Sequence, residues 1–471
     1  MTTLIMKFGG TSVGTPSALT QVLSIVLHEH QRWDKLILVA SALDGVTDSL
    51  LEAAYLAQVS NQRGYRRIAA TLRTRHMALV DQLPLGQQER NALQADIDRL
   101  LAEMLDTCQT ASNASLDKLS PMISDSISSV GERLSARIIA SLLRQNGLLS
   151  VAIDGTDVLV TDNVHGNASP IIALTEQRIQ QNLLPMLERG IVPVVTGFIG
   201  ATQEGITTTI GRGGSDYTAS VLAICSNATQ VWIWSGVDGM MSADPHEIDN
   251  AQMIPELTYN EVAELAYFGA RILHMRMIAP LQEKLIALRI KNIFKPQLVG
   301  TLIQKNVSQS PSRVKAVTTI QSIGLMTQRS GSLASVIQIV DDTLFATVGS
   351  RADVMISAQS SGMSFVCFVV PTSVAMEAID TIRTTLQEKL VDLHEATQWT
   401  IKPMSVITAV GDSLNESMTI VADVLRCLNG THIYAISQGP SRCSLSVVVD
   451  THDAEVALQR VHEYTLAESK A

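Results

Sequence analysis

Charged side chains beside glycine-rich turns are the residues of this sequence whose types and spacing suit chemistry. The segment Thr208 to Ala223, TTIGRGGSDYTASVLA, places Arg212 among three glycines and Asp216 at the start of an expected helix. The planar fork of an arginine binds a carboxylate through two hydrogen bonds. We therefore expect a carboxylate site at Arg212, with Gly213 and Gly214 leaving room for the ligand and Asp216 holding an ammonium group or orienting a lysine. The alternative is an ordinary turn with a solvated arginine.

A lysine near the amino terminus has a similar setting. Lys7 precedes Gly9 and Gly10 in the sequence MKFGG. Its ammonium group can reach phosphate oxygens there, while the glycines let backbone N–H groups approach the same ligand. The segment differs from the Walker pattern GxxxxGK[ST], so a surface lysine beside a turn is the alternative.

Three further polar residues belong to similar turns. Glu132 lies at a glycine-flanked helix start, where it can bind a substrate ammonium group or simply favour the helix dipole. Ser41 and Thr47 flank the turn after the apolar run LILVA. Together with Lys7 and Arg212, these residues predict a site for a zwitterion with an extra carboxylate beside a phosphate donor.

Short apolar runs predict the strands that position these residues. Residues 4–8, 16–30 and 35–42 read as a strand, a helix and a strand, which is one βαβ unit. The runs at 191–200 and 230–239 are apolar, rich in β-branched residues and end in glycine, as in strands buried in a parallel sheet. Ligands of open α/β sheets bind beyond the carboxyl ends of the strands, so we expect the site there.

Composition limits the class of protein. A chain of 471 residues is expected to form two or three domains, and the net charge of −10 argues against a nucleic-acid partner. The five cysteines form no CxxC pair, and the sequence has neither a signal-peptide pattern nor an apolar run long enough for a membrane span. These features predict a reduced, cytoplasmic α/β protein without a membrane or nucleic-acid role.

The last third of the chain contains an internal repeat. The stretch ISAQSSGMSFVCFVV is echoed by AISQGPSRCSLSVVV, and each follows a strand-like and a helix-like segment. We therefore predict two small βαββ modules, at about 320–390 and 400–471. They contain few candidate catalytic residues, so binding or assembly is their expected role.

Several motifs resemble those of the aspartokinases, a branch of the amino-acid kinase superfamily, and they occur in the right order. These are KFGGTSVG, SVGERLS, VTGFIG, TTIGRGGSDYTA, VDG followed by ADP, FGARILH and GTLI. The resemblance implies an amino-acid kinase fold over residues 1–297 and a regulatory region over 298–471 with two ACT-like modules. No reductase-sized extension follows, so we expect a monofunctional form rather than a fusion with homoserine dehydrogenase.

The resemblance also implies a reaction: phosphorylation of the β-carboxylate of L-aspartate by ATP, the first step of lysine, threonine and methionine biosynthesis. Lys7 would act on the transferring phosphoryl group with Asp216 as the second catalytic residue, and Arg212, Glu132, Ser41 and Thr47 would bind aspartate. Mg²⁺ would be held by the nucleotide and not by protein ligands. The residues implied at the nucleotide are Lys7, Gly9, Gly10, Thr11, Ser235, Gly236, Val237, Met241, His246 and Arg271.

The sequence departs from the family pattern near the nucleotide. Where aspartokinases usually read TDVDGVYTADPR, this chain reads SGVDGMMSADPH, so Gly236 replaces an aspartate, Met241 a tyrosine and His246 an arginine. Arg271 replaces a lysine and Met275 a proline in the segment FGARILHM. These changes predict weaker or altered nucleotide use. The second hypothesis is therefore a regulatory or weakly active protein.

Regulation is expected through the ACT-like modules. Gln359 and Gln438 match glutamines that line effector sites in threonine-responsive aspartokinases, although both can equally be residues that end strands. The resemblance implies lysine or threonine as an effector and a homodimer or homotetramer assembled through these modules. A third hypothesis, a kinase acting on acetylated glutamate or another aspartate analogue, is disfavoured by the expected ammonium ligands Glu132 and Asp216.

Overall fold

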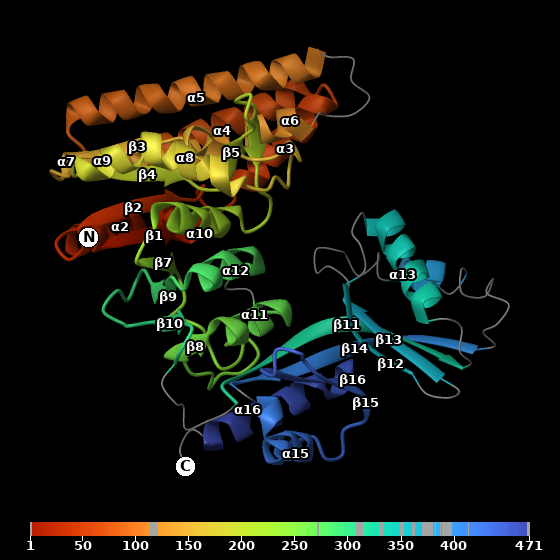
Figure 1. Ribbon diagram of the computed structural model, residues 1–471. Helices are drawn as coiled ribbons and strands as arrows, with labels where there is room; N and C mark the ends of the chain where they lie inside the picture. Colours follow the sequence, from red (N-terminus) through yellow and green to blue (C-terminus); the bar gives the residue numbers. More distant parts are fainter. Residues whose placement is uncertain are drawn as a thin grey trace. The chain divides into compact units, whose positions relative to one another are not determined.

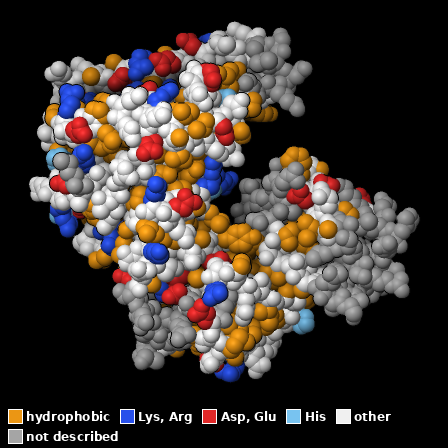
Figure 2. All heavy atoms as spheres, viewed as in Figure 1, with side chains coloured by type: hydrophobic (Ala, Val, Ile, Leu, Met, Phe, Trp, Pro, Cys, Tyr) orange, Lys and Arg blue, Asp and Glu red, His pale blue; other side chains and the backbone are white. Residues whose placement is uncertain are grey.

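Two compact units that alternate along the chain make up the protein. The computed structural model describes residues 2–113, 121–270, 273–307, 314–328, 333–348, 353–359, 363–369, 380–381, 383–386, 388, 398–412 and 414–468. The first unit comprises Met1–Met240, Met253–Tyr259 and Ile272–Val307, and the second comprises Met241–Gln252, Asn260–Arg271 and Ser308–Ala471. None of the described helices is long and apolar enough to cross a membrane. On the face that Figure 2 shows, basic and acidic side chains are interspersed.

An eight-stranded sheet lies at the centre of the first unit (Figure 1). The order is β3, β4, β2, β1, β7, β9, β10 and β8; the first six strands are parallel, and β10 and β8 run in the opposite direction. The strands span Thr3–Phe8 (β1), Lys35–Ala40 (β2), Ser150–Ile153 (β3), Val192–Thr196 (β4), Gln230–Ser235 (β7), Glu256–Thr258 (β8), Ala287–Asn292 (β9) and Thr301–Gln304 (β10). The predicted α/β class with a mostly parallel sheet is confirmed.

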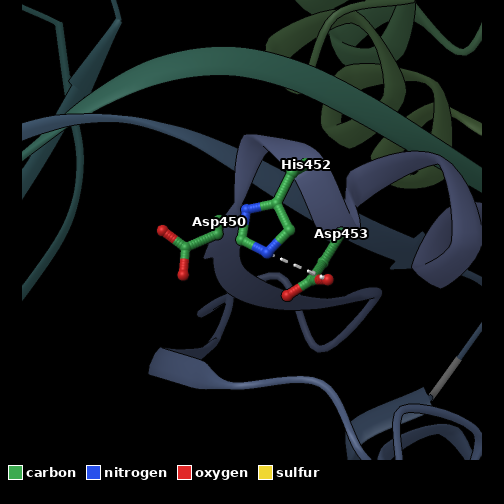
Figure 3. A group of neighbouring side chains, drawn as sticks. All are labelled: Asp450, His452 and Asp453. Carbon is green, nitrogen blue, oxygen red and sulfur yellow. Dashed lines mark ion pairs between the residues drawn. The ribbon is translucent and has the colours of Figure 1, made fainter.

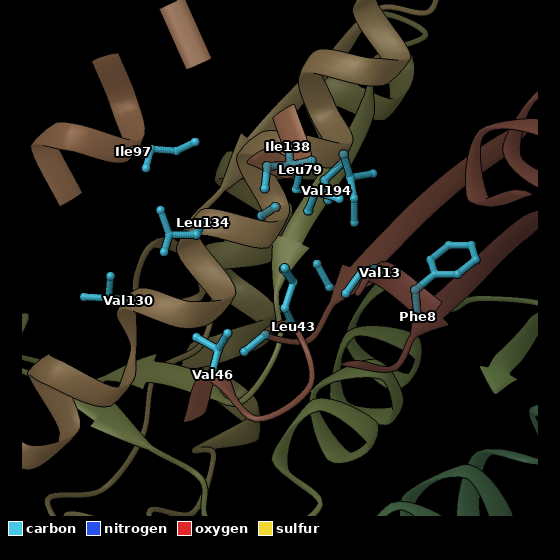
Figure 4. Packing of buried hydrophobic residues seen from close by; sticks show 14 of the residues in the cluster. Phe8, Val13, Leu43, Val46, Leu79, Ile97, Val130, Leu134, Ile138 and Val194 are labelled. Atoms are coloured by element: carbon cyan, nitrogen blue, oxygen red, sulfur yellow. The ribbon is translucent and has the colours of Figure 1, made fainter. Parts of the chain in front are cut away.

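Helices join the strands of this sheet; some pack directly against it and others pack on those helices. They span Gly10–Val13 (α1), Pro16–His30 (α2), Val46–Gln58 (α3), Gln62–Asp81 (α4), Gln87–Asn113 (α5), Pro121–Ser128 (α6), Val130–Gln145 (α7), Ile172–Asn182 (α8), Leu184–Glu188 (α9), Gly214–Ser226 (α10) and Met275–Lys284 (α12). In α7, the apolar residues Val130, Leu134 and Ile138 recur every four positions and so share one face. They join one buried cluster with Val194 of β4 (Figure 4).

The apolar run at 191–200 forms two strands rather than the single strand that its composition predicts. β4 ends at Thr196, and Phe198 adopts a left-handed backbone conformation with φ of 68°. The chain turns at this point and enters β5 (Ile199–Ala201), which pairs with β6 (Thr207–Thr209) in a separate two-stranded sheet. A left-handed backbone is costly for a bulky residue, so the structure around Phe198 must hold this turn in place.

The second unit is built on a six-stranded antiparallel sheet in the order β12, β13, β11, β14, β16 and β15. The long strands β11 (Ala316–Gln328) and β14 (Gln398–Val410) pair at its centre. Each is followed by a helix and two strands, so the predicted βαββ order of both halves is confirmed. The remaining elements are α13 (Leu333–Val348), β12 (Asp353–Gln359), β13 (Met363–Val369), α15 (Met418–Cys427), β15 (Ile433–Gln438), β16 (Ser444–Asp450) and α16 (Ala454–Glu468).

Two excursions from the first unit are anchored in the second. Ala243 and Ile248 join the apolar cluster beneath β14 and α16, and Ser242 Oγ lies 2.8 Å from His462 Nε2. Most of α11 (Tyr259–Tyr267) also belongs here, because Glu261 forms a buried ion pair with Lys315 at 3.0 Å.

Candidate functional site

The carboxyl ends of β1 and β2 and the amino terminus of α10 border a cleft of about 350 Å³ in the first unit. All eight residues that the sequence predicts as catalytic or substrate-binding line it. Parallel pairing brings them together, since β1 lies between β2 and β7 in the sheet. The lining residues are Lys7, Gly10, Ser41, Ala42, Leu43, Asp44, Gly45, Thr47, Asp48, Glu132, Phe198, Gly211, Arg212, Gly213, Gly214, Ser215 and Asp216.

Lys7 and Asp216 form an ion pair in this cleft. The Nζ atom of Lys7 lies 2.6 Å from Oδ1 of Asp216, and the two side chains are 12% and 14% exposed. Lys7 lies near the end of β1, whereas Asp216 lies in the first turn of α10. This ion pair keeps the ammonium group beside the carboxylate in the cleft, where its hydrogens can also reach a ligand.

Arg212 projects from a turn whose backbone requires glycine. Gly211 and Gly213 have φ values of 81° and 71°, and a Cβ on Gly213 would collide with the ring of His274. Within the part of the chain that the structure describes, Arg212 has no carboxylate partner. Its exposed guanidinium group is therefore available for a ligand carboxylate.

Glu132 is a buried carboxyl group at the start of α7. Glu132 is 3% exposed, and among the described residues its Oε2 atom has no hydrogen-bond partner. Burial raises the pKa of Glu132 to about 8, although hydrogen bonds from the amides of Ala42 and of Glu132 itself act in the opposite direction. An unpartnered carboxyl oxygen at the wall of a cleft is suited to a cationic ligand group, which would favour the ionised form.

Several residues at this site were not predicted from the sequence. Phe198 lines the cleft at its left-handed turn, and Asp44 and Asp48 lie at its edge. His274 contacts the glycine turn, and burial lowers its pKa. Phe198 belongs to the motif VTGFIG and His274 to the motif FGARILH, so both motifs pointed to these segments. Neither a phenylalanine nor a histidine by itself predicts a contact with the glycine-rich turn at 211–214.

The residues predicted at the nucleotide lie in several places. Ser235, Gly236 and Val237 follow one another at the end of β7, and Gly236 has open space around it. Gly10 lines the cleft, whereas the amide of Gly9 donates to the carbonyl of Trp234.

Of the other residues predicted to contact the nucleotide, Thr11, Met241 and His246 do not line the cleft. Thr11 is exposed in α1, Met241 and His246 belong to the second unit, and Arg271 lies outside the described residues.

An acidic residue that the sequence analysis did not assign connects the loops after β7 and β9. Asp238 accepts hydrogen bonds from Asn292 Nδ2 at 2.5 Å and from Lys295 Nζ at 2.9 Å. These two hydrogen bonds lower the pKa of Asp238. Asn292 also donates to the carbonyl of Gly236. The loop around Gly236 is therefore held in place without the aspartate that the family pattern has there.

The second unit contains the predicted effector residues. Gln438 is exposed at the end of β15; Gln359 ends β12, and its side chain lies outside the described part of the structure.

One group among the described residues has metal-like spacing: Asp450, His452 and Asp453 (Figure 3). The Asp450 carboxylate already accepts from Lys402 at 2.6 Å and from the Tyr434 hydroxyl at 2.9 Å. Because Asp450 already forms an ion pair with Lys402, its carboxylate has little negative charge left for a metal ion.

Comparisons with known proteins agree with this architecture. The chain is 28% identical to lysine-sensitive aspartokinase 3 of Escherichia coli, over 98% of both chains. It is 29% identical to the chloroplastic bifunctional aspartokinase/homoserine dehydrogenase 2 of Arabidopsis thaliana, over 97% of this chain and 50% of that protein. It thus spans about half the length of several curated relatives that it matches.

The crystal structure of E. coli aspartokinase III in complex with aspartate and ADP superimposes with a TM-score of 0.76 at 26% identity, covering 98% of this chain and 99% of that one. An ACT domain model matches residues 407–464, within the second predicted module. The amino acid kinase family model matches residues 2–292, which include every residue that lines the cleft. The resemblance to the aspartokinases is confirmed, and the chain belongs to the amino acid kinase family.

Proposed function

We propose that the protein transfers the γ-phosphoryl group of ATP to the β-carboxylate of L-aspartate. The observation that carries this proposal is the convergence of the Lys7–Asp216 ion pair, the exposed guanidinium group of Arg212 and the buried carboxyl group of Glu132 on one cleft. A dicarboxylic amino acid has a matching group for each of these features. The names of the relatives support the same substrate, and one solved relative holds aspartate and ADP.

The residues suggest how the reaction proceeds. Arg212 binds the α-carboxylate, and Glu132 receives the ammonium group, which leaves the β-carboxylate directed toward Lys7. An oxygen of that carboxylate attacks the γ-phosphorus, the bond between this phosphorus and the bridging oxygen breaks, and ADP leaves with the electron pair. No general base is needed, since a carboxylate is ionised at neutral pH. Lys7 stabilises the negative charge on the phosphoryl group during transfer. Asp216 holds the ammonium group of Lys7 in place through their ion pair.

The nucleotide would lie beside the ends of β7 and β9. Lys295, which forms an ion pair with Asp238 at 2.9 Å, and the loop from Ser235 to Asp238 lie there. Mg²⁺ arriving with ATP would neutralise phosphate charge. Since Gly236 lacks the side chain that the family pattern supplies, we expect this nucleotide site to be weakened by roughly 1 to 2 kcal/mol.

Formation of aspartyl hydroxamate tests the proposal. The purified protein is incubated with aspartate, ATP, Mg²⁺ and hydroxylamine, and the acyl phosphate is trapped. Hydroxamate that depends on both substrates supports the proposal, and acetylated glutamate serves as the comparison substrate. No hydroxamate at any ATP or GTP concentration, together with retained aspartate binding, would favour the second candidate, a regulatory protein. The open position of Gly236 is the observation behind that candidate.

Regulation through the second unit forms part of the proposal. The name of the E. coli relative includes sensitivity to lysine, and an ACT domain lies in the matching part of this chain. Lysine is therefore the first effector to test. Addition of lysine or threonine to the hydroxamate assay separates the two, and inhibition by neither would count against an end-product effector.

A further inference from the structure

A buried aspartate lies behind the turn that carries Arg212. Asp125 of α6 is 2% exposed and lies outside the cleft lining. Its carboxylate accepts from Thr209 Oγ1 at 2.5 Å, from His165 Nδ1 at 2.8 Å, and from the amide of Gly166 at 3.1 Å. Asp125 thus binds the last residue of β6 and the loop at 165–166 together.

The loop at 165–168 packs directly against the glycine-rich turn at 211–214. A Cβ on Gly211 would come within 2.9 Å of Asn167 Oδ1 and 3.0 Å of the carbonyl of Gly166. The amide of Ala168 also donates to the carbonyl of Thr209 at 2.9 Å. The backbone of the turn therefore rests directly on the segment that Asp125 holds.

Arg276 of α12 holds the same two segments at different atoms. Its guanidinium group donates to the carbonyl of Ile210 at 2.7 Å, to Asn167 Oδ1 at 3.0 Å and to the carbonyl of Ala168 at 3.3 Å. It also lies over the ring of Tyr217, 4.8 Å from the ring centre. None of these partners is an acid, so the contacts of Arg276 serve to hold backbone and ring in position.

We propose that Asp125 and Arg276 are positioning residues that brace the turn at 209–213 and so fix Arg212 for recognition of the aspartate carboxylate. This inference rests on the proposed function. A turn with glycine at 211, 213 and 214 has more conformations to lose than a turn with side chains at these positions, and holding it in the bound conformation before the ligand arrives removes that cost from binding. Loss of either brace should weaken aspartate binding more than it slows phosphoryl transfer.

Thr209 and Arg276 allow a test that leaves the buried Asp125 in place. The change Thr209→Val removes the hydroxyl group that bonds to Asp125 and keeps the volume, whereas Thr209→Ser keeps the hydroxyl group. The change Arg276→Met keeps a long side chain without donors. A matched control is Arg144→Met, since Arg144 also donates to a carbonyl but lies 12 residues along α7 from Glu132, about 18 Å away by helix rise.

The first measurement is the rate of amide hydrogen exchange at residues 210–216. The second is the affinity for aspartate, as a Kd from calorimetry, compared with KM and kcat from steady-state assays. We expect Thr209→Val and Arg276→Met each to speed exchange there and to raise the aspartate Kd about three- to tenfold, with kcat changed less than about threefold. Thr209→Ser and Arg144→Met should remain within about twofold of the parent Kd. The double variant should be less than additive, since both changes free the same turn.

Unchanged exchange in both variants, or faster exchange with an aspartate Kd within twofold of the parent, would overturn the inference. A parent protein that neither binds aspartate nor forms hydroxamate would instead defeat the proposed function. In that case the exchange measurement still shows whether Asp125 and Arg276 hold the turn at 209–213, whereas their proposed role in aspartate binding would be refuted together with the proposed function.

Discussion

Binding of aspartate is expected to release a proton from Glu132. Burial raises the pKa of this carboxyl group to about 8 from its ordinary value of 4.5, which costs the charged form roughly 5 kcal/mol. The group is therefore mostly protonated at neutral pH while the cleft holds no cation. A substrate ammonium group beside the unpartnered Oε2 atom favours the carboxylate and drives the proton off.

The size of this release follows from the raised pKa. If the ammonium group returns the pKa to near its ordinary value, about 0.9 proton leaves per aspartate bound at pH 7, about 0.5 at pH 8 and about 0.1 at pH 9. Calorimetric titration of aspartate in buffers with different ionisation enthalpies measures the number directly. The change Glu132→Gln keeps the shape of the side chain and provides the control, since it has no proton to release.

A release near zero at pH 7 in the parent protein, or an equal release from Glu132→Gln, would refute the assignment of Glu132 as the ammonium ligand. Stability offers a second check. Because the folded protein holds this proton more tightly than the unfolded chain, the free energy of unfolding should fall as the pH rises from 4.5 through about 8. Glu132→Gln should lack this part of the pH dependence.

Three further outcomes follow from the structure. Lys7→Ala should lower kcat roughly a hundredfold or more while changing aspartate binding little, and lost aspartate binding in calorimetry would contradict this. Gly236→Asp has open space and should lower the KM for ATP by about tenfold in steady-state assays, and an unchanged KM would contradict a contact between this loop and the nucleotide. Leu134→Ala should lower the free energy of unfolding by roughly 2 to 5 kcal/mol in urea titrations, whereas Leu149→Ala, at a 64% exposed position, should change it by less than about 0.5 kcal/mol.

The sequence predicted the sheet and the cleft well because both depend on local signals. Apolar runs followed by turn signals identified β1, β2 and β7, and parallel pairing then brings Lys7 and Ser41 to one edge. The βαββ repeat was visible for the same reason, since each half repeats its own pattern of alternation.

The parts that sequence reasoning missed depend on distant partners. Asp125 and Thr209 are 84 positions apart, and Arg276 meets Ile210 across 66 positions. No local pattern shows that a particular aspartate faces a particular threonine, because such pairs arise only when α6 packs on β6. The left-handed turn at Phe198 was hidden for another reason: most of the run at 191–199 is apolar or β-branched, which favours an uninterrupted strand despite Gly197.

The alternation of the two units along the chain affects how the protein can be divided. The chain passes from one unit to the other at residues 240/241, 252/253, 259/260, 271/272 and 307/308. A fragment that stops at residue 297 would therefore retain Ala243 and Ile248 without the apolar partners that cover them, and Glu261 without Lys315. Such a truncation exposes apolar surface and removes Lys315 from the buried Glu261, so this fragment produced alone is expected to aggregate rather than to fold as an independent domain.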